Sequence, residues 1–110
     1  MPRRRKYRVQ WTRPAAQDLE SIVEFIARDN IANALQVLKK IQTTAATLAR
    51  MPERGRIVPE LADVGLRLYH EILCTPWRII YRIAAPSVFV MTVIDGRRNV
   101  EDILLERLTR

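Results

Sequence analysis

The sequence predicts an α+β fold in which a helical hairpin covers one face of a curled antiparallel sheet. Three observations lead to this fold class: an alternating segment near the start, two neighbouring stretches of helical periodicity, and three strand-like runs followed by a final helical stretch. With 110 residues, of which 48% are hydrophobic, the chain is long enough to bury one core without disulfides or metal. We therefore expect a single domain over residues 1–110.

The first part of the chain predicts a strand and two helices. The segment KYRVQWT (6–12) alternates apolar and polar side chains, as a half-buried strand does. Pro14 suits the first turn of a helix, and Asp18 and Glu20 fall early in it, where the helix dipole favours acids. The apolar stripe of this helix is Ala15, Leu19, Ile22, Val23 and Ile26. Asn30 suits the N-cap of a second helix, whose stripe is Ile31, Ala34, Leu35, Leu38, Ile41, Ala45 and Leu48. Few polar residues separate the stripes, so the helices should pack as an antiparallel hairpin.

The middle of the chain predicts a loop, and the part that follows predicts a three-stranded meander. Residues 51–65 contain two prolines and two glycines, and we interpret them as a long surface loop. Strand-like runs follow at 66–73, 77–84 and 88–94, and their short connections require antiparallel neighbours. The last run is nearly all apolar, which is typical of a central strand covered on both faces.

Two arginines stand where the last strand gives way to the final helix. Asn99 should cap this helix while Asp102 reciprocates, a variant of the capping box, ahead of an apolar face formed by Val100, Ile103, Leu104 and Leu108. Arg97 and Arg98 precede the cap, although a helix N-terminus disfavours neighbouring cations. Two interpretations follow: an anionic partner binds at this helix end, or nearby acids neutralise the arginines, the candidates being Asp95, Glu101 and Asp102.

The middle strand of the predicted meander carries a second pair of arginines. Alternation places Arg78 and Arg82 on one face of this strand. Trp77 and Tyr81 point to the other face, where they should pack against the helical hairpin. We expect the face with the arginines to be open, so that the pair requires either Glu71 across the strands or an anionic ligand.

The composition argues against several classes of site and compartment. One cysteine, Cys74, and one histidine, His70, provide neither a disulfide nor a zinc site, so we expect no metal or other cofactor. We interpret both residues as parts of the core. No apolar run approaches the ~18 residues of a membrane span, and the start MPRRRKYR lacks the hydrophobic region of a secretory signal. We therefore expect a soluble cytoplasmic protein without a membrane partner.

The positive charge of the chain is concentrated at its start. The formal net charge is +7, and five of the 19 basic residues lie within the first eight positions, namely Arg3, Arg4, Arg5, Lys6 and Arg8. Residues 1–6 can be interpreted as a flexible basic arm that binds nucleic-acid phosphates or an acidic protein. The alternative is a solvated end without a specific role.

Three segments, YRVQWTRPAAQDLESIVEFIA, PWRIIYRI and VFVMTVIDGRRNVEDIL, carry a family resemblance. They look like the first strand and helix and the C-terminal half of the RelE/ParE toxin superfamily of bacterial type II toxin–antitoxin modules. The resemblance extends from Tyr7 to Leu108 in the same order of elements. It implies the α+β fold described above and a toxin that a cognate antitoxin protein neutralises.

The RelE branch of this superfamily implies ribosome-dependent cleavage of mRNA, with basic residues around the scissile phosphate. Arg78 matches the arginine of the R-x-x-Y strand and Arg98 the second basic residue after the glycine, so these two would be the catalytic residues. Other positions depart from the RelE pattern, with Tyr69, Glu71 and Leu104 in place of two lysines and a catalytic tyrosine. Some nucleases of the superfamily use histidine and glutamate, here His70 and Glu71, but alternation places this pair on opposite faces.

The ParE branch keeps the scaffold without that nuclease set, and its implied activity is the inhibition of DNA gyrase. The segment GRR, followed by a well-capped last helix, resembles this branch more closely. We predict a ParE-like gyrase inhibitor; the alternatives are a RelE-like mRNA endonuclease acting with the ribosome and a non-toxic nucleic-acid-binding module. The antitoxin should fold on binding and place acids opposite the arginines. The predicted residues for contact with the target or the antitoxin are Arg78, Arg82, Arg97 and Arg98.

Overall fold

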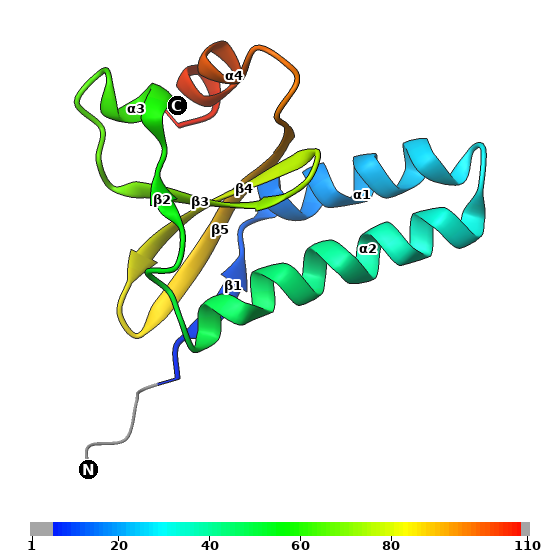
Figure 1. Ribbon diagram of the computed structural model, residues 1–110, viewed down its shortest axis with the longest axis horizontal. Helices are drawn as coiled ribbons and strands as arrows, with labels where there is room; N and C mark the ends of the chain where they lie inside the picture. The colour runs from blue at the N-terminus through cyan, green and yellow to red at the C-terminus, as the bar shows by residue number, and fades with distance from the viewer. Residues whose placement is uncertain (1–5, 109–110) are drawn as a thin grey trace.

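The computed structural model describes residues 6–108 and contains a five-stranded sheet with helices on both faces (Figure 1). Residues 1–5, which hold most of the predicted basic arm, lie outside the described part of the chain. The strands lie in the order β1-β5-β4-β3-β2. The elements in chain order are β1 (Arg8–Trp11), α1 (Arg13–Ala27), α2 (Ile31–Ala46), the 3-10 turn η1 (Thr47–Ala49), β2 (Arg56–Ile57), α3 (Pro59–Ala62), β3 (Tyr69–Cys74), β4 (Trp77–Ala84), β5 (Ser87–Asp95) and α4 (Val100–Leu108). The predicted α+β class is confirmed, with its N-terminal strand, helical hairpin, antiparallel meander and C-terminal helix.

The first strand differs from the prediction in its direction. β1 runs parallel to β5, with Val9 opposite Val88 and Trp11 opposite Val90, so the sheet is mixed rather than wholly antiparallel. The alternation within β1 specifies which side chains are buried but carries no information about strand direction, which explains the error. β5 lies between β1 and β4, and its predicted central position is therefore confirmed.

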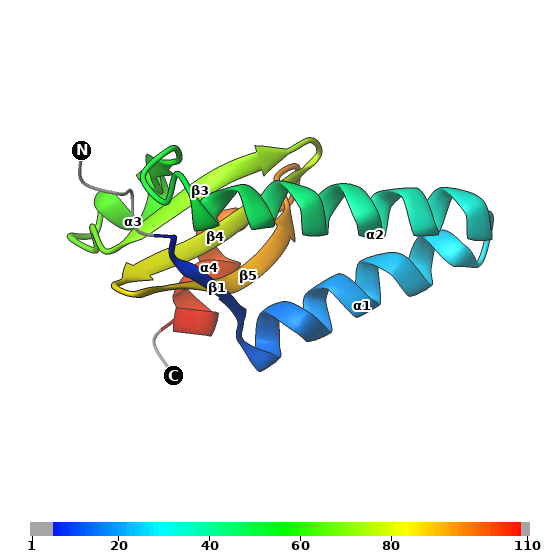
Figure 2. The ribbon, with the colours of Figure 1, turned by 90° about the horizontal axis from the view of Figure 1, so that it is seen from below.

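The helices α1 and α2 form the predicted antiparallel hairpin on one face of the sheet (Figure 2). The side-chain oxygens of Thr12 and Asn30 cap the two helices by accepting hydrogen bonds from backbone N–H groups at 3.4 and 2.9 Å. Pro14 lies in the first turn of α1, as predicted. Trp77 and Tyr81 pack in the core between the hairpin and the sheet, also as predicted. The far end of the hairpin extends beyond the sheet and exposes Phe25, Ile31 and Leu35.

The opposite face of the sheet is covered by α3 and α4, which corrects the prediction of an open face (Figure 1). The segment 51–65, predicted as a long loop, contains β2 and α3. Val58 and Leu61 of this segment are fully buried in a second apolar cluster, together with Ile80, Ile94, Val100 and Leu104. Elements of two and four residues are too short to produce a periodic pattern in the sequence, so the segment looked like a loop.

The meander has the short connections that the sequence predicted. β3 begins at Tyr69, three residues later than expected, and β5 continues to Asp95. An irregularity between Ile80 and Tyr81 shifts the register of β4 against β5. Cys74 is a buried free cysteine, in agreement with its predicted place in the core. Within residues 6–108, no helix has the length and apolar character needed to cross a membrane.

Candidate functional site

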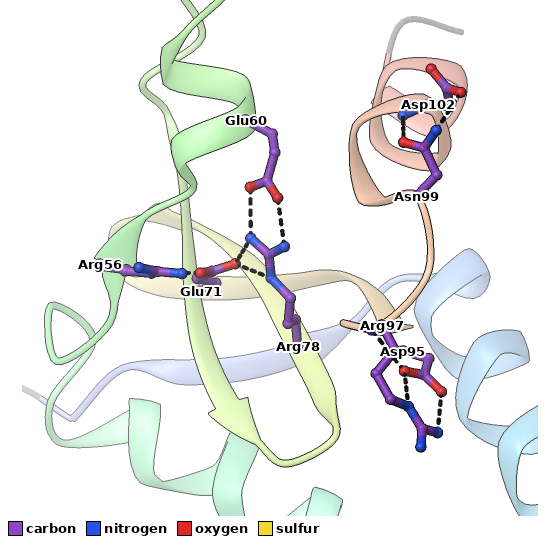
Figure 3. A network of polar contacts seen from close by, with 8 residues as sticks. All are labelled: Arg56, Glu60, Glu71, Arg78, Asp95, Arg97, Asn99 and Asp102. Atoms are coloured by element: carbon purple, nitrogen blue, oxygen red, sulfur yellow. Dashed lines mark hydrogen bonds and ion pairs between the residues drawn. The ribbon is translucent and has the colours of Figure 1, made fainter.

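Arg78, one of the predicted contact residues, lies inside a network of four charged side chains (Figure 3). Its Nη1 and Nη2 atoms each donate a hydrogen bond to a carboxylate oxygen of Glu60 at 2.7 Å. Its Nε donates to Oε1 of Glu71 at 2.7 Å, and Nε of Arg56 donates to Oε2 of Glu71 at 2.6 Å. The network therefore ties β2 and the short helix α3 to the two strands β3 and β4.

The network is built around a buried carboxylate. Glu71 is only 2% exposed and Arg78 8% exposed, whereas the side chain of Arg56 reaches solvent. A buried carboxylate requires charged partners because removing it from water is costly, and here a guanidinium occupies each oxygen. Hydrogen bonding from Arg78 lowers the pKa of the Glu60 carboxyl, and the same pairing raises the pKa of the Arg78 guanidinium. Both groups of this pair are therefore charged at neutral pH.

The pairing of Arg78 with Glu71 was one of the two predicted outcomes, and it is confirmed. Glu60 was missed because it lies in the segment that was predicted as a loop. The Nε and both Nη atoms of Arg78 each donate at least one hydrogen bond to a carboxylate, so a phosphate held by two of these nitrogens would have to displace a carboxylate. A contact or catalytic role for Arg78 would therefore require the network to rearrange.

Arg97 lies in the turn between β5 and α4 and is neutralised within that turn (Figure 3). Its Nε and Nη2 atoms donate to the two carboxylate oxygens of Asp95 at 2.9 and 2.6 Å, and its backbone N–H donates to Oδ1 at 2.9 Å. These bonds lower the pKa of Asp95 to about 2. Of the two interpretations for this turn, neutralisation by a neighbouring acid is the one observed for Arg97.

The predicted cap of the last helix is also present. The backbone N–H of Asp102 donates to Oδ1 of Asn99 at 3.4 Å, and Nδ2 of Asn99 donates to Oδ2 of Asp102 at 2.9 Å (Figure 3). The reciprocal bond thus goes to the side-chain amide of Asn99 rather than to its backbone. Glu101 and Asp102 also place two acids in the first turn, where they offset the positive charge beside it.

Arg98 and Arg82 are the predicted arginines whose guanidinium groups make no hydrogen bond or ion pair with the described residues. Arg98 is exposed in the turn before α4. Gly96 of the same turn packs close to the aliphatic stem of Arg78. Arg82 is exposed near the other end of β4, opposite Phe89. The four predicted arginines therefore do not form one surface: one is buried, two follow β5 and one lies apart.

A second polar cluster, centred on Asp18, was not predicted as part of a site. Oδ2 of Asp18 accepts hydrogen bonds from the Thr92 hydroxyl at 2.7 Å and from the Val93 N–H at 3.1 Å. Nη2 of Arg107 donates to Oδ1 of Asp18 at 2.6 Å, so the carboxylate joins α1, β5 and α4. Asp18 and Glu20 both lie beyond the first turn of α1, which corrects the dipole role predicted for these two acids. Asp18 is three residues after the buried Ala15 and so lies on the apolar face of the helix. A charged side chain on that face was the sequence signal that could have identified Asp18 as a buried polar residue.

A cleft of about 370 Å³ opens beside this cluster, between α1, the end of β5 and α4. Its apolar lining comes from Ile22, Val93, Ile94 and Ile103, and its charged lining includes Asp18, Asp95, Arg98 and Arg107. A recess with both apolar and charged lining is suited to a side chain of a protein partner, because its apolar side chains offer burial and its charged side chains offer orientation. Arg98 is thus placed at the edge of a recess as well as in an exposed turn.

Among the remaining catalytic candidates, Glu71 lies in the charged network and Leu104 in the core, whereas His70 is partly exposed and lies outside both apolar clusters, which corrects its predicted place in the core. The His70 ring stacks on Tyr81 with centroids 5.7 Å apart, and its Nδ1 has no hydrogen-bond partner within the described chain. Leu104, at the position of the RelE-type tyrosine, is fully buried. Across residues 6–108, no three His, Cys, Asp or Glu side chains are grouped so that they could hold a metal ion.

Comparison with known proteins gives consistent findings for sequence and fold. Residues 9–100 match the family described as ParE toxin of type II toxin–antitoxin system, parDE. The chain is 30% identical to Toxin ParE3 of Caulobacter vibrioides over 94 residues, which cover 84% of this chain and 90% of that protein. A structure of the chromosomal ParDE system from P. aeruginosa has a TM-score of 0.69 at 18% identity, covering 83% of this chain and 97% of that one. The toxin–antitoxin complex RelBE2 from Mycobacterium tuberculosis has a TM-score of 0.55 at 20% identity, covering 86% and 97%.

Proposed function

Because this chain belongs to the ParE toxin family of type II toxin–antitoxin systems, we propose that it inhibits DNA gyrase and that a cognate antitoxin protein neutralises it. The resemblance to ParE implies gyrase as the target, and the similar ParDE and RelBE2 systems support an antitoxin as the partner. The observation that favours gyrase over mRNA cleavage is the commitment of Arg78 to Glu60 and Glu71.

A RelE-like nuclease would need Arg78 to bind the scissile phosphate. Arg78 would first have to leave its two carboxylates, and breaking a buried ion pair costs about 3–5 kcal/mol. The departure would also leave the buried Glu71 with Arg56 alone. Leu104 offers no acid or base at the position where the RelE pattern has its tyrosine. These features support a ParE-like scaffold that acts by binding rather than by phosphate chemistry.

Arg98, Arg97 and Arg82 are the proposed contact residues for the target or the antitoxin. Arg98 is the main candidate, because its guanidinium is exposed beside a cleft and has no ion pair within the described chain. Arg97 shares its charge with Asp95, and Arg82 lies apart from the turn. Arg78 is assigned a supporting role, since its stem packs beneath the glycine of this turn.

Two assays with the purified chain separate the two candidate targets. We expect the wild-type chain to block supercoiling by gyrase and to trap cleavage complexes, without cutting translated mRNA in a primer-extension assay. Arg98→Ala should require about tenfold more protein for the same inhibition, whereas Arg28→Ala, at an exposed site near the far end of α1, should behave as wild type. Codon-linked cuts in mRNA that vanish in Arg98→Ala would instead identify a RelE-like nuclease.

The neutralisation part of the proposal has its own test in cells. Controlled expression of the chain in a bacterium should arrest growth, and co-expression of the adjacent small gene should rescue it. A non-toxic nucleic-acid-binding module predicts no arrest, and it predicts binding whose log K falls by ~0.7–0.9 with log salt for each phosphate contacted. Loss of function on deleting residues 1–6 would support that module, and undiminished toxicity would exclude it.

A further inference from the structure

The cleft beside the Asp18 cluster has walls that are tied to one another. It has a volume of about 370 Å³ and lies between α1, the end of β5 and α4. The carboxylate of Asp18, in α1, accepts hydrogen bonds from the Thr92 hydroxyl and the Val93 N–H of β5. It also accepts hydrogen bonds from Nη2 and Nη1 of Arg107, in α4, at 2.6 and 2.9 Å. Because one carboxylate joins all three elements, the cleft is formed before any partner binds.

The acids that line the cleft already have basic neighbours. Asp95 binds the guanidinium of Arg97 through both carboxylate oxygens, and Figure 3 shows this pair in the turn after β5. Hydrogen bonding with Asp18 and, less strongly, the charge of Glu106 raise the pKa of Arg107. A cation that entered the cleft would therefore have to compete with an arginine for each of these carboxylates.

Arg98 differs from the other charged side chains that line the cleft. Its guanidinium is exposed and makes no hydrogen bond or ion pair with any residue in the described range 6–108. An anionic group that approaches Arg98 therefore displaces no carboxylate from it. This charge favours a partner that brings a negative charge to the cleft.

The apolar lining restricts the class of partner further. It comes from Ile22, Val93, Ile94 and Ile103. Duplex DNA turns its phosphates outward and stacks its bases inside, so a phosphate on Arg98 would leave this lining uncovered. A polypeptide with an acidic side chain next to an apolar one satisfies both features, because the carboxylate pairs with Arg98 while the apolar side chain is buried. The volume lies near the lower end of the ~300–1,000 Å³ of ligand pockets, which suits individual side chains rather than a whole helix.

We propose that the cleft binds an acidic and apolar surface loop of DNA gyrase, with a glutamate or aspartate on Arg98 and a neighbouring apolar side chain against Ile22 and Ile103. The inference rests on the proposed gyrase inhibition and names the protein surface of the enzyme, rather than its DNA, as the group that is contacted. A folded enzyme offers protruding side chains that enter a preformed recess with little rearrangement. A segment that folds on binding, as we expect of the antitoxin, gains its affinity from a large covered surface and needs no such recess.

Filling the cleft tests the proposal without removing any packing from the core. Ser21 is an exposed residue of α1 that lines the cleft. Ser21→Trp places a bulky side chain there, and we expect about tenfold more of this variant to be needed to block supercoiling by gyrase. Gln36→Trp adds the same side chain at an exposed position of α2 and should stay within about twofold of the wild-type chain. Ser21→Trp combined with Arg98→Ala should cost about tenfold rather than about hundredfold, because both changes act on the same occupant.

A photo-crosslinking benzoylphenylalanine at position 17 identifies the class of molecule that enters the cleft. Gln17 is exposed one helical turn before Ser21, so the crosslinker stands beside the cleft without filling it. With purified gyrase, the crosslink should form to a gyrase subunit both with and without a linear DNA duplex. It should fall by about tenfold when Ser21→Trp or Arg98→Glu is added. If Ser21→Trp does not fold, the crosslink and its loss with Arg98→Glu decide the inference.

The outcomes separate this inference from the proposed function. A Ser21→Trp variant that inhibits gyrase as strongly as the wild-type chain overturns the inference and leaves gyrase inhibition intact. Losses that multiply in the double variant have the same meaning, because Ser21 and Arg98 would then act on different contacts. A crosslink to DNA alone, or to the added antitoxin but not to gyrase, assigns the cleft to that partner and overturns the inference. A wild-type chain without effect on gyrase overturns both the inference and the proposed function.

Discussion

Glu71 lies between the guanidinium groups of Arg56 and Arg78, which occupy its two carboxylate oxygens. Replacing Glu71 with alanine leaves Arg78 in the same buried place with Glu60 as its remaining partner. We expect Glu71→Ala to lower the free energy of unfolding by about 3 kcal/mol or more. The control Glu53→Ala, at an exposed site in the preceding loop, should change it by less than about 0.5 kcal/mol. Urea unfolding measures both, and a loss below about 1 kcal/mol for Glu71→Ala would contradict a structural role for the network.

Glu60 makes the free energy of unfolding depend on pH. Its carboxyl has a pKa below the ordinary value of 4.5 in the folded chain, mainly because Arg78 donates hydrogen bonds to it. A depressed folded-state pKa contributes stability that is fully present above 4.5 and is lost as the pH falls through the lowered value. The difference in unfolding free energy between wild type and Glu60→Gln should therefore be largest near neutral pH and shrink below 4.5. An equal difference at neutral pH and at about pH 3.5 would contradict this origin.

At the scale of elements, α4 is joined to the hairpin and to β5 through one carboxylate. Removing the partly exposed Arg107 should cost less than about 1 kcal/mol, because solvent screens the ion pair. Asp18→Ala should cost about 2–3 kcal/mol, because it also leaves the Thr92 hydroxyl and the Val93 N–H without their acceptor. Glu20→Ala, exposed on α1, is the control. Urea unfolding compares these losses, and hydrogen exchange should show Arg107→Ala loosening α4 but not the hairpin. Equal losses for Arg107→Ala and Asp18→Ala would contradict this account.

The elements that the sequence predicted are those with a sustained pattern. The hairpin helices and the three strands of the meander each repeat their period over several residues, and Asn30 and Asn99 mark helix starts through side chains with a known capping preference. β2 and α3 are too short for any period, so Glu60 and the covered face of the sheet could not be foreseen. The direction of β1 depends on where the hairpin returns the chain, which no local pattern contains.

The charged pairs of the candidate site also differ in whether local sequence could predict them. Arg97 pairs with Asp95, two residues earlier, and Arg78 pairs with Glu71 on the neighbouring strand. Both acids are close enough in the sequence pattern for each pairing to be predicted as an alternative to an anionic ligand. Asp18 and Arg107 are separated by 89 positions, and only the packing of α4 on the sheet, which places Arg107 within reach of α1, brings them together. Local sequence therefore predicts which charges need a partner, whereas tertiary packing decides which partner is within reach.

For the molecule as a whole, the net charge of +7 should steer an acidic antitoxin toward the basic surfaces. If the turn before α4 is one of these surfaces, the association rate should depend on the position of the positive charges as well as on the net charge. Arg97→Glu combined with Arg98→Glu should slow association with the antitoxin by about tenfold at low salt and change dissociation much less. Arg28→Glu combined with Lys39→Glu alters the net charge equally, but at exposed sites on the hairpin.

Surface-binding kinetics over a range of salt concentrations distinguishes steering by the turn from steering by net charge. Exposed charges more than a Debye length apart, about 10 Å at 0.1 M salt, are largely screened from one another, so the variants should converge toward wild type as salt rises. At low salt, the turn variant should associate more slowly than the hairpin variant, because the proposed contact residues of the turn would place their reversed charges beside the antitoxin. Equal slowing by both pairs would mean that the turn does not face the antitoxin. Arg98 would then be available to the proposed gyrase target alone, and the supercoiling assay with Arg98→Ala would measure its contribution.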